Sequence, residues 1–192
     1  NTLDKTHPKL TKEWHPTKNG NLNPSDYTYG SKIKVWWKCN KGDDHEWSAS
    51  ISNRSRLGRG CAICAGKKVV YSNSLLKTHP KLAKEWHPTK NVSSPLDFVA
   101  GSNTKAWWKC AKGKDHIWEA KIANRAYLSR GCPVCSGHKV VYSNSLKAVY
   151  PKIASELHPT KNGENTADNI YAGGSKKYWW KCDKDDDHEW QT

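Results

Sequence analysis

The chain lacks methionine altogether and has a single phenylalanine among its 192 residues. No apolar run approaches the roughly 18 residues of a membrane-spanning helix, and no apolar signal-peptide segment stands at the start. We therefore expect no membrane partner, and an intracellular protein of a reducing compartment (cytoplasm, nucleus or virion) rather than a secreted one. Without methionine the chain has no initiator, so we expect it to be an internal part of a longer repeat protein.

Acidic residues are also scarce. The sequence has 18 Asp and Glu against 32 Lys and Arg, which gives a formal net charge of +14. Such an excess attracts anionic partners, and nucleic acid is the first candidate. No phosphate-binding loop and no Ser/His/Asp constellation is present, so we expect no small-molecule substrate.

An internal repeat organises the chain. A ten-residue segment that ends in His-Pro-Thr-Lys-Asn occurs three times, at residues 10–19, 82–91 and 153–162. Each copy is followed by Trp-Trp-Lys-Cys, at residues 36–39, 107–110 and 179–182. The copies are offset by 71 or 72 residues, which is long enough for each to be a small domain. We expect zinc modules at residues 1–72, 73–143 and 144–192, the third truncated before its second Cys pair.

The seven cysteines follow the same repeat. An odd number does not suit a closed set of intrachain disulfides. Each complete copy instead shows Cys-x5-His-x15-Cys-x2-Cys, and three thiolates with one imidazole form the usual shell of a structural zinc ion. The predicted ligands are Cys39, His45, Cys61 and Cys64, and then Cys110, His116, Cys132 and Cys135. The alternatives are disulfides with a stray thiol, or an iron–sulfur or redox site.

Local patterns place these ligands on secondary structure. We expect a helix that begins near Thr6 and carries Leu10 and Trp14 on one face. Residues 34–39 and 46–53 are β-type runs, joined by a Gly/Asp-rich metal knuckle, and a basic turn leads to the last Cys pair. This order predicts small α+β zinc-stabilised modules in tandem treble-clef or zinc-ribbon-like repeats, built from a short helix, β-hairpins and a zinc knuckle.

The sequence also predicts roles for the histidines of the His-Pro segments and for the paired tryptophans. His15, His87 and His158 lie far upstream of the cysteines, so we expect them to order a turn through a ring hydrogen bond rather than to bind zinc. Trp36 and Trp37 are adjacent in a predicted strand and must point to opposite faces. One packs into the core, and the other either packs on the second side of a thin layer or offers a stacking platform for a base.

The combined pattern resembles a known family. Leu-x3-Trp-His-Pro-Thr-Lys-Asn, Gly-Ser-x4-Trp-Trp-Lys-Cys, His-x-Trp and Gly-Cys-x2-Cys-x-Gly are similar to the probable zinc-ribbon domain family, tandem treble-clef-type repeats of unknown function in bacteria and large DNA viruses. The resemblance implies the same eight ligands, and makes Cys182 and His188 the first half of a third site. Some members lie beside nuclease-like domains, which implies nucleic-acid work. Leu157 departs from the pattern, because the family has Trp there.

The positive charge gathers next to the predicted zinc sites. Copy one has 13 basic and 6 acidic residues, copy two has 12 and 4, and copy three has 7 and 8. Arginine suits phosphate because its planar fork can bind two oxygens. The predicted nucleic-acid contacts are Arg54, Arg56, Arg59, Lys67, Lys68, Arg125, Arg130 and Lys139.

The sequence therefore predicts a zinc-binding repeat array that binds nucleic acid, DNA before RNA. The alternatives are a structural zinc module that docks onto proteins of a larger assembly, and the targeting arm of a nuclease outside these residues. We expect no enzyme activity, because a closed four-ligand zinc site leaves no position for a reactive water. Asn124 after His116 superficially resembles a His-Asn-His nuclease site, but both zinc-site histidines are already needed as ligands.

Overall fold

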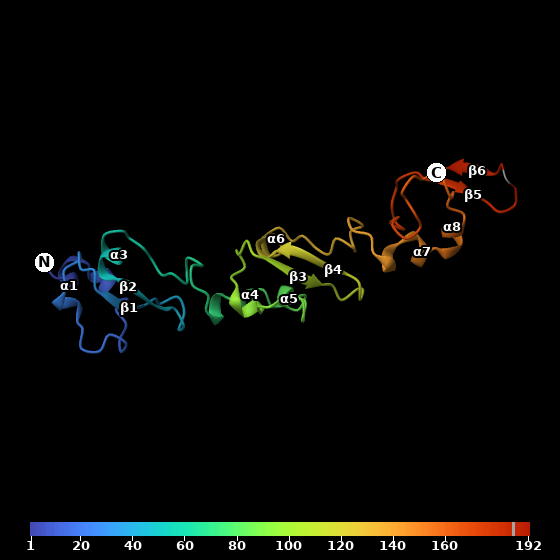
Figure 1. Ribbon diagram of the computed structural model, residues 1–192. Coiled ribbons are helices and arrows are strands. Elements are labelled where there is room, and N and C mark those ends of the chain that lie inside the picture. The colour runs from blue at the N-terminus through green and yellow to red at the C-terminus, as the bar shows by residue number, and fades with distance from the viewer. Residues whose placement is uncertain (186) are drawn as a thin grey trace. The chain divides into compact units, whose positions relative to one another are not determined.

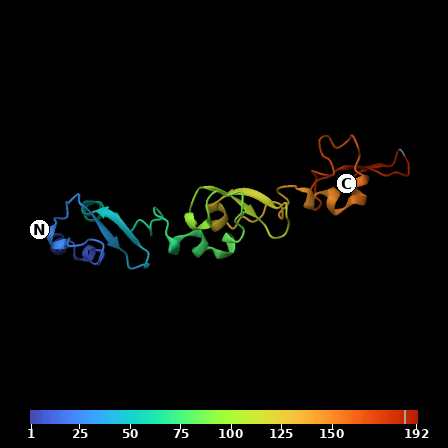
Figure 2. The same ribbon diagram turned by 60° about the horizontal axis from the view of Figure 1, so that its bottom comes forward.

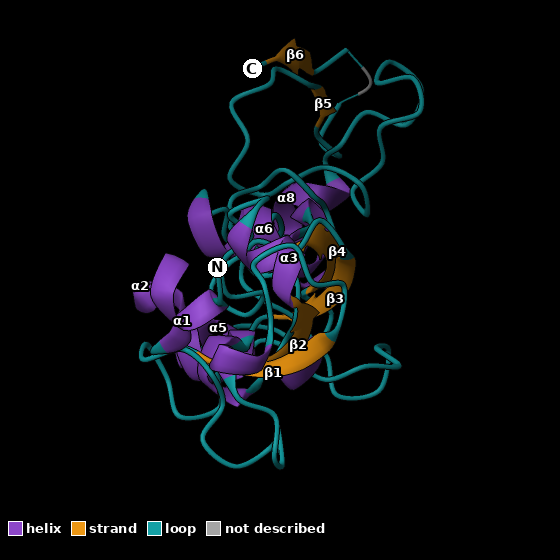
Figure 3. Cartoon of the chain, turned by 90° about the vertical axis from the view of Figure 1, so that its left-hand side faces the viewer, coloured by secondary structure: helices purple, strands orange, loops and turns teal. Residues whose placement is uncertain are grey.

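The computed structural model describes residues 1–185 and 187–192, which form short helices and strands joined by long turns (Figures 1 and 3). Contacts divide the chain into two compact units, residues 1–84 with 92–103, and residues 85–91 with 104–192. None of the described helices is long and apolar enough to cross a membrane. The module boundaries expected from the repeat stay a prediction.

The first unit begins with paired short helices and a hairpin. Its elements are α1 (Leu3–Thr6), α2 (Pro8–Thr11), η1 (Pro24–Asp26), β1 (Lys34–Lys38), β2 (Glu46–Ser50) and α3 (Ile51–Ser55). They are followed by η2 (Tyr71–Asn73), α4 (Leu75–Thr78), α5 (Pro80–Ala83) and η3 (Pro95–Asp97). Strands β1 and β2 pair antiparallel with Trp37 opposite Trp47, and α3 follows β2 directly (Figure 2).

The second unit repeats the hairpin twice. Its elements are β3 (Lys105–Lys109), β4 (Ile117–Lys121), α6 (Ile122–Tyr127), η4 (Tyr142–Asn144), α7 (Leu146–Val149), α8 (Pro151–Ser155), β5 (Trp179–Lys181) and β6 (Glu189–Gln191). Trp108 lies opposite Trp118, and Trp180 lies opposite Trp190. The predicted α+β modules with antiparallel hairpins are therefore confirmed.

The helix expected to carry Leu10 and Trp14 is shorter than predicted. His7 leaves the helical region (φ −135°, ψ 57°), because the ring of Pro8 restricts the residue before it. Helix α2 begins at Pro8 and ends at Thr11, so Trp14 lies beyond it. Trp14 instead forms an isolated antiparallel bridge with Trp37. The two rings pack edge to face, with their centroids 5.5 Å apart. Tertiary packing on Trp37 thus ends the helix early.

Tryptophan fills each core. Trp37 is fully buried, and its ring nitrogen donates to the carbonyl of Ala49 (3.0 Å). Trp36 faces the other side of the strand and is half-buried beneath the Nζ of Lys18, 4.9 Å from the ring centroid. The expected division of this pair between two faces is confirmed. In the second unit Trp108 is fully buried in the same way, with its ring nitrogen bonded to the carbonyl of Ala120.

Two arginines of the predicted nucleic-acid set belong to these cores. The guanidinium of Arg54 lies over the rings of Trp37 (5.2 Å) and Trp47 (5.1 Å), and only 8% of the residue is exposed. It forms an ion pair with Glu13 and donates to the carbonyl of Arg59. Arg54 is therefore a core residue whose charged group is bonded within the protein.

Arg125 repeats this arrangement in the second unit. Its guanidinium lies over Trp108 and Trp118, forms an ion pair with Glu85 and donates to the carbonyl of Arg130. The prediction that Arg54 and Arg125 contact a nucleic acid is corrected, because their cationic groups are buried and already bonded.

Arg54→Ala is expected to destabilise the zinc-loaded protein by about 2–3 kcal/mol. This is less than the 3–5 kcal/mol of a fully buried pair, because water still reaches the Glu13 carboxylate. Arg56→Ala, which removes an exposed arginine two residues away, should change stability by less than about 0.5 kcal/mol. Urea unfolding followed by tryptophan fluorescence measures both, and equal midpoints would refute the internal role of Arg54.

Candidate metal centres

The hairpin and its knuckle position the first two ligands of each cluster. Cys39 directly follows β1 and His45 directly precedes β2. The amide of Cys39 donates to the carbonyl of His45 (3.0 Å), and the amide of His45 donates to that of Gly42 (3.1 Å). Cys61 directly precedes a turn that contains Cys64. Backbone amides also point at the sulfurs, since Lys41 N lies 3.4 Å from Cys39 Sγ.

The four predicted ligands of the first site converge. The Sγ atoms of Cys39 and Cys64 are 3.8 Å apart, and His45 Nδ1 lies 3.8 Å from Cys61 Sγ and 3.3 Å from Cys64 Sγ. A tetrahedral zinc ion with Zn–S of about 2.3 Å and Zn–N of about 2.0–2.1 Å spaces its ligand atoms about 3.5–3.8 Å apart. The donor set therefore fits zinc in both chemistry and spacing.

The second site repeats this geometry. Cys110 Sγ lies 3.7 Å from Cys135 Sγ, and His116 Nδ1 lies 3.6 Å from Cys132 Sγ and 3.4 Å from Cys135 Sγ. In each cluster all four ligand atoms lie within 4.8 Å of one another. The seven cysteines, all of them in the described part of the chain, are free of disulfides. The prediction of two Cys3His zinc sites is confirmed.

A bound cation would change the protonation of these clusters. Burial, together with the neighbouring sulfurs of Cys39 and Cys61, raises the pKa of the Cys64 thiol to about 11. The pKa of Cys135 is raised to about 11 for the same reasons. Three thiolates at such distances repel one another, and a bound Zn²⁺ relieves the repulsion and keeps the thiols deprotonated. Four protein ligands close the zinc shell, which is the arrangement of a structural site.

A serine and an aspartate support each zinc-site histidine. His45 presents Nδ1 to the sulfurs and Nε2 to Ser72 Oγ (3.2 Å). Ser72 in turn donates from Oγ to Asp44 Oδ1 (2.6 Å) and from its amide to Asp44 Oδ2 (2.9 Å). These bonds lower the pKa of Asp44. Such a chain fixes the orientation of a metal-binding histidine.

The second cluster has the same support from Ser143 and Asp115. Sequence reasoning missed these residues. The signal was present, because Asp-His and Tyr-Ser-Asn-Ser recur in both complete copies, at residues 44–45 and 71–74 and at residues 115–116 and 142–145.

The third repeat brings its two predicted ligands together. Cys182 Sγ lies 3.4 Å from His188 Nδ1, although Cys182 is half-buried and His188 exposed. The exposed carboxylates of Asp185 and Asp187 gather near His188, as exposed acidic groups often do without a metal. Cys182 and His188 as half of a third zinc site stay a prediction.

The upstream histidines order their turns. His15 Nδ1 accepts hydrogen bonds from the amides of Thr17 (3.2 Å) and Lys18 (3.0 Å). His87 and His158 each accept the equivalent pair of amides. The expectation of a turn-ordering ring hydrogen bond is confirmed.

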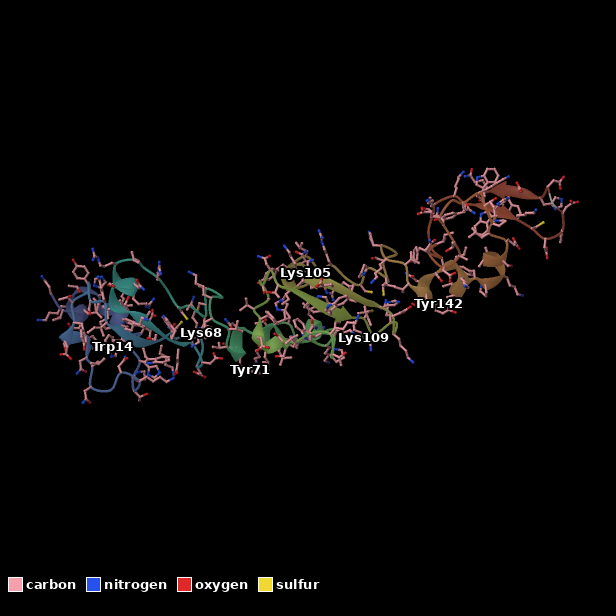
Figure 4. The ribbon with its side chains drawn as sticks, viewed as in Figure 1. Trp14, Lys68, Tyr71, Lys105, Lys109 and Tyr142 are labelled. Carbon is pink, nitrogen blue, oxygen red and sulfur yellow. The ribbon has the colours of Figure 1, made fainter. Side chains whose placement is uncertain are left out.

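The remaining residues of the predicted nucleic-acid set lie on the surface beside the clusters. They are Arg56, Arg59, Lys67, Lys68, Arg130 and Lys139, and all are exposed. The Nζ of Lys68, labelled in Figure 4, donates to the carbonyl of Glu46 (2.9 Å). Lys139 donates to the carbonyl of Ile117 in the same way (2.9 Å).

Comparison with known proteins agrees with this geometry. A family model described as a probable treble clef zinc finger domain matches residues 10–67, 82–138 and 153–192. The three matches coincide with the three copies of the repeat and together cover most of the chain. No curated protein matches the chain.

Metal analysis of the purified chain is expected to give two zinc ions per molecule, one for each complete shell. Cys61→Ser should reduce this to one, because three ligands in a buried cluster cannot close the shell. Cys182→Ser serves as the matched control and should leave two. A single ion or none in the unaltered chain would contradict the ligand assignment.

Gly42→Ala is expected to weaken the first zinc site. An added Cβ at Gly42 would lie 2.7 Å from Cδ2 of His45, so the metal-binding ring or the knuckle backbone must move. Gly60→Ala is the control, since a Cβ there meets nothing within 4 Å. Competition with a chromogenic chelator measures the affinity, and we expect at least about a tenfold loss, the lower range for disturbing a supporting contact. Equal zinc retention by both variants would show that the knuckle tolerates the Cβ.

Proposed function

We propose that this chain, which belongs to the family of probable treble clef zinc finger domains, is a non-catalytic repeat array that binds nucleic acid, DNA before RNA. Zinc holds each complete module together, and exposed basic side chains make the contacts. The thiolates must stay reduced, so the proposal includes a reducing intracellular compartment.

One observation carries the proposal: a basic turn is anchored beside each zinc cluster. The first basic turn, residues 56–60, exposes Arg56 and Arg59, and the second, residues 128–131, exposes Arg130. Buried Arg54 donates to the backbone carbonyl of Arg59 and thereby holds the turn in place from the inside. The exposed guanidinium groups therefore project from a fixed backbone, which lowers the entropy lost on binding phosphate.

A pocket adjoins the first basic turn. It has a volume of about 260 Å³ and lies between β2, α3 and the turn that carries Cys61 and Cys64. Arg59, Lys67 and Asn53 line it together with Trp47. Cationic and amide side chains around an aromatic ring suit a phosphate or sugar of a nucleic-acid backbone. They carry no base-reading pattern, so we expect little sequence preference.

Repetition strengthens such weak contacts. Two complete modules on one chain give the second contact a high effective concentration once the first has formed. Because the contacts are electrostatic, binding should release counterions and weaken steeply as salt rises.

Protein docking is the second candidate function. Leu57 and Leu128, on the two basic turns, and Tyr127, just before the second, are each about 60% exposed. Exposed apolar side chains at equivalent places in two modules suit a contact with another protein.

Replacing Arg56, Arg59 and Arg130 together by Gln is expected to weaken nucleic-acid binding and to flatten its salt dependence. Losing up to three phosphate contacts should reduce the slope of log K against log salt by about 2–3. The matched control replaces Lys147, Lys152 and Lys176, three exposed lysines of the third repeat, and should have the smaller effect.

Fluorescence anisotropy with a 20-mer duplex and a 20-mer single strand measures both variants. If the unaltered chain binds neither probe at low salt, the nucleic-acid proposal is wrong and protein docking is favoured. If the two triple variants lose affinity equally, the basic turns are not the contact surface.

A further inference from the structure

Glu46 pairs with three basic side chains on the outer face of the first hairpin. Its carboxylate lies 3.0 Å from His15 Nε2 and 3.5 Å from Lys38 Nζ, and it also pairs with Lys18. These bonds, led by that of Lys18, lower the pKa of Glu46 to about 2. The first repeat thus offsets part of the charge of its own cationic cluster with an acidic side chain.

The third repeat does the same. Glu189 lies 2.8 Å from His158 Nε2 and also pairs with Lys161, which in turn lies over the ring of Trp179 at 4.9 Å. The pKa of Glu189 is again lowered to about 2. A glutamate that directly follows the knuckle histidine is the common element of both arrangements.

The second repeat keeps the basic residues and lacks the glutamate. Ile117 stands at the position of Glu46, whereas His87, Lys90 and Lys109 stand at the positions of His15, Lys18 and Lys38. Neither Lys90 nor Lys109 has an acidic partner among residues 1–185 and 187–192. Glu119, two residues after Ile117, forms its ion pair with Lys105 (3.5 Å).

His87 adds a hydrogen-bond donor to this group. Its Nδ1 accepts from the amides of Thr89 (3.3 Å) and Lys90 (3.2 Å), so the ring proton of the neutral form is on Nε2. The residue is only 7% exposed, and no described residue accepts a hydrogen bond from Nε2. Burial, followed by the charges of Lys90 and Lys109, lowers the pKa of His87, which keeps the ring neutral.

The two lysines come from the turn after His87 and from the end of β3. Lys90 Nζ lies 4.4 Å from the centroid of Trp107, so the indole supports the ammonium group from below. Lys109 is the last residue of β3 and is labelled in Figure 4. Lys139 donates to the carbonyl of Ile117, which brings a further positive charge to the same strand end.

We propose that the second repeat holds an anion site, formed by His87, Lys90 and Lys109, which takes a phosphate group in the place that a glutamate carboxylate fills in the first and third repeats. A phosphate offers acceptor oxygens to the three donors and offsets part of the charge of the two ammonium groups, as the glutamate carboxylate does in the first repeat. The inference deepens the proposed function, on which it rests for the source of the phosphate, a nucleic-acid backbone. Free inorganic phosphate shares the chemistry and is the other source.

Ile117→Glu tests the site in the zinc-loaded full chain, because this substitution restores the residue that the sibling repeats carry. Inorganic phosphate is titrated while the imidazole signals of His87 are followed by NMR. We expect a saturable shift in the unaltered chain and at least about a tenfold loss of phosphate affinity in Ile117→Glu, the loss of one charge-assisted hydrogen bond or more. Val92→Glu, at a fully exposed position, makes the same charge change and is the control. Glu46→Ile should create the response at His15.

The nucleic-acid titration is repeated with the same variants. A phosphate response at His87 without nucleic-acid binding would uphold the site with free phosphate as its source, and would overturn the proposed function. If the unaltered chain, Ile117→Glu and Val92→Glu all bind nucleic acid with the same affinity, and His87 shows no phosphate response, the anion site is wrong and the proposed function stands. A phosphate response that survives Ile117→Glu would also overturn the site.

Discussion

The coordination of one zinc ion by three thiolates and an imidazole is the interaction on which each complete module depends. A repeat of 71 or 72 residues buries only a modest core, and here its α-helices have four to six residues. Apparent zinc-binding free energies of about 10–16 kcal/mol in small fingers exceed what such a core supplies. The metal joins the knuckle after β1 to the turn at Cys61, two segments that lie far apart in the sequence. The helices and strands of the module pack around these two metal-linked segments.

A second, smaller interaction completes the module: a buried arginine over two tryptophans. Arg54 covers the hydrophobic core that the zinc ion does not reach and ties the α3 end of the module to Glu13. Together with aliphatic side chains such as Leu3 and Ile51, it helps to fill the interior of a chain without methionine and nearly without phenylalanine. Flat indole faces accept a planar cation where other proteins place aliphatic side chains.

The sequence predicted the parts of this structure that spacing controls and missed those that packing controls. Ligand spacing and the His-Pro turn follow from local chemistry, and their predictions are confirmed. The strand predicted over residues 46–53 is confirmed only as far as Ser50, because residues 51–53 begin helix α3, which Ser50 caps. The helix ends before Trp14 because that ring packs on Trp37, and no local signal shows this. Arg54 and Arg56 are both arginines two positions apart, yet one is buried and the other exposed. The repeat gave a signal that the prediction did not use, because Arg54 recurs as Arg125 whereas Tyr127 stands at the position of Arg56.

The contact between His45 and Ser72 has a consequence for how such arrays arise. Ser72 and its neighbour Asn73, which donates to the carbonyl of Ile63 (2.9 Å), brace the zinc cluster from the segment that leads into the next repeat. The zinc-site histidine therefore depends on residues at the far end of its own period. A duplication that copied one period but left out this short lead would produce a module whose metal-binding histidine is unsupported. A duplicated copy must therefore extend through Ser72 and Asn73 to carry its own support for the histidine.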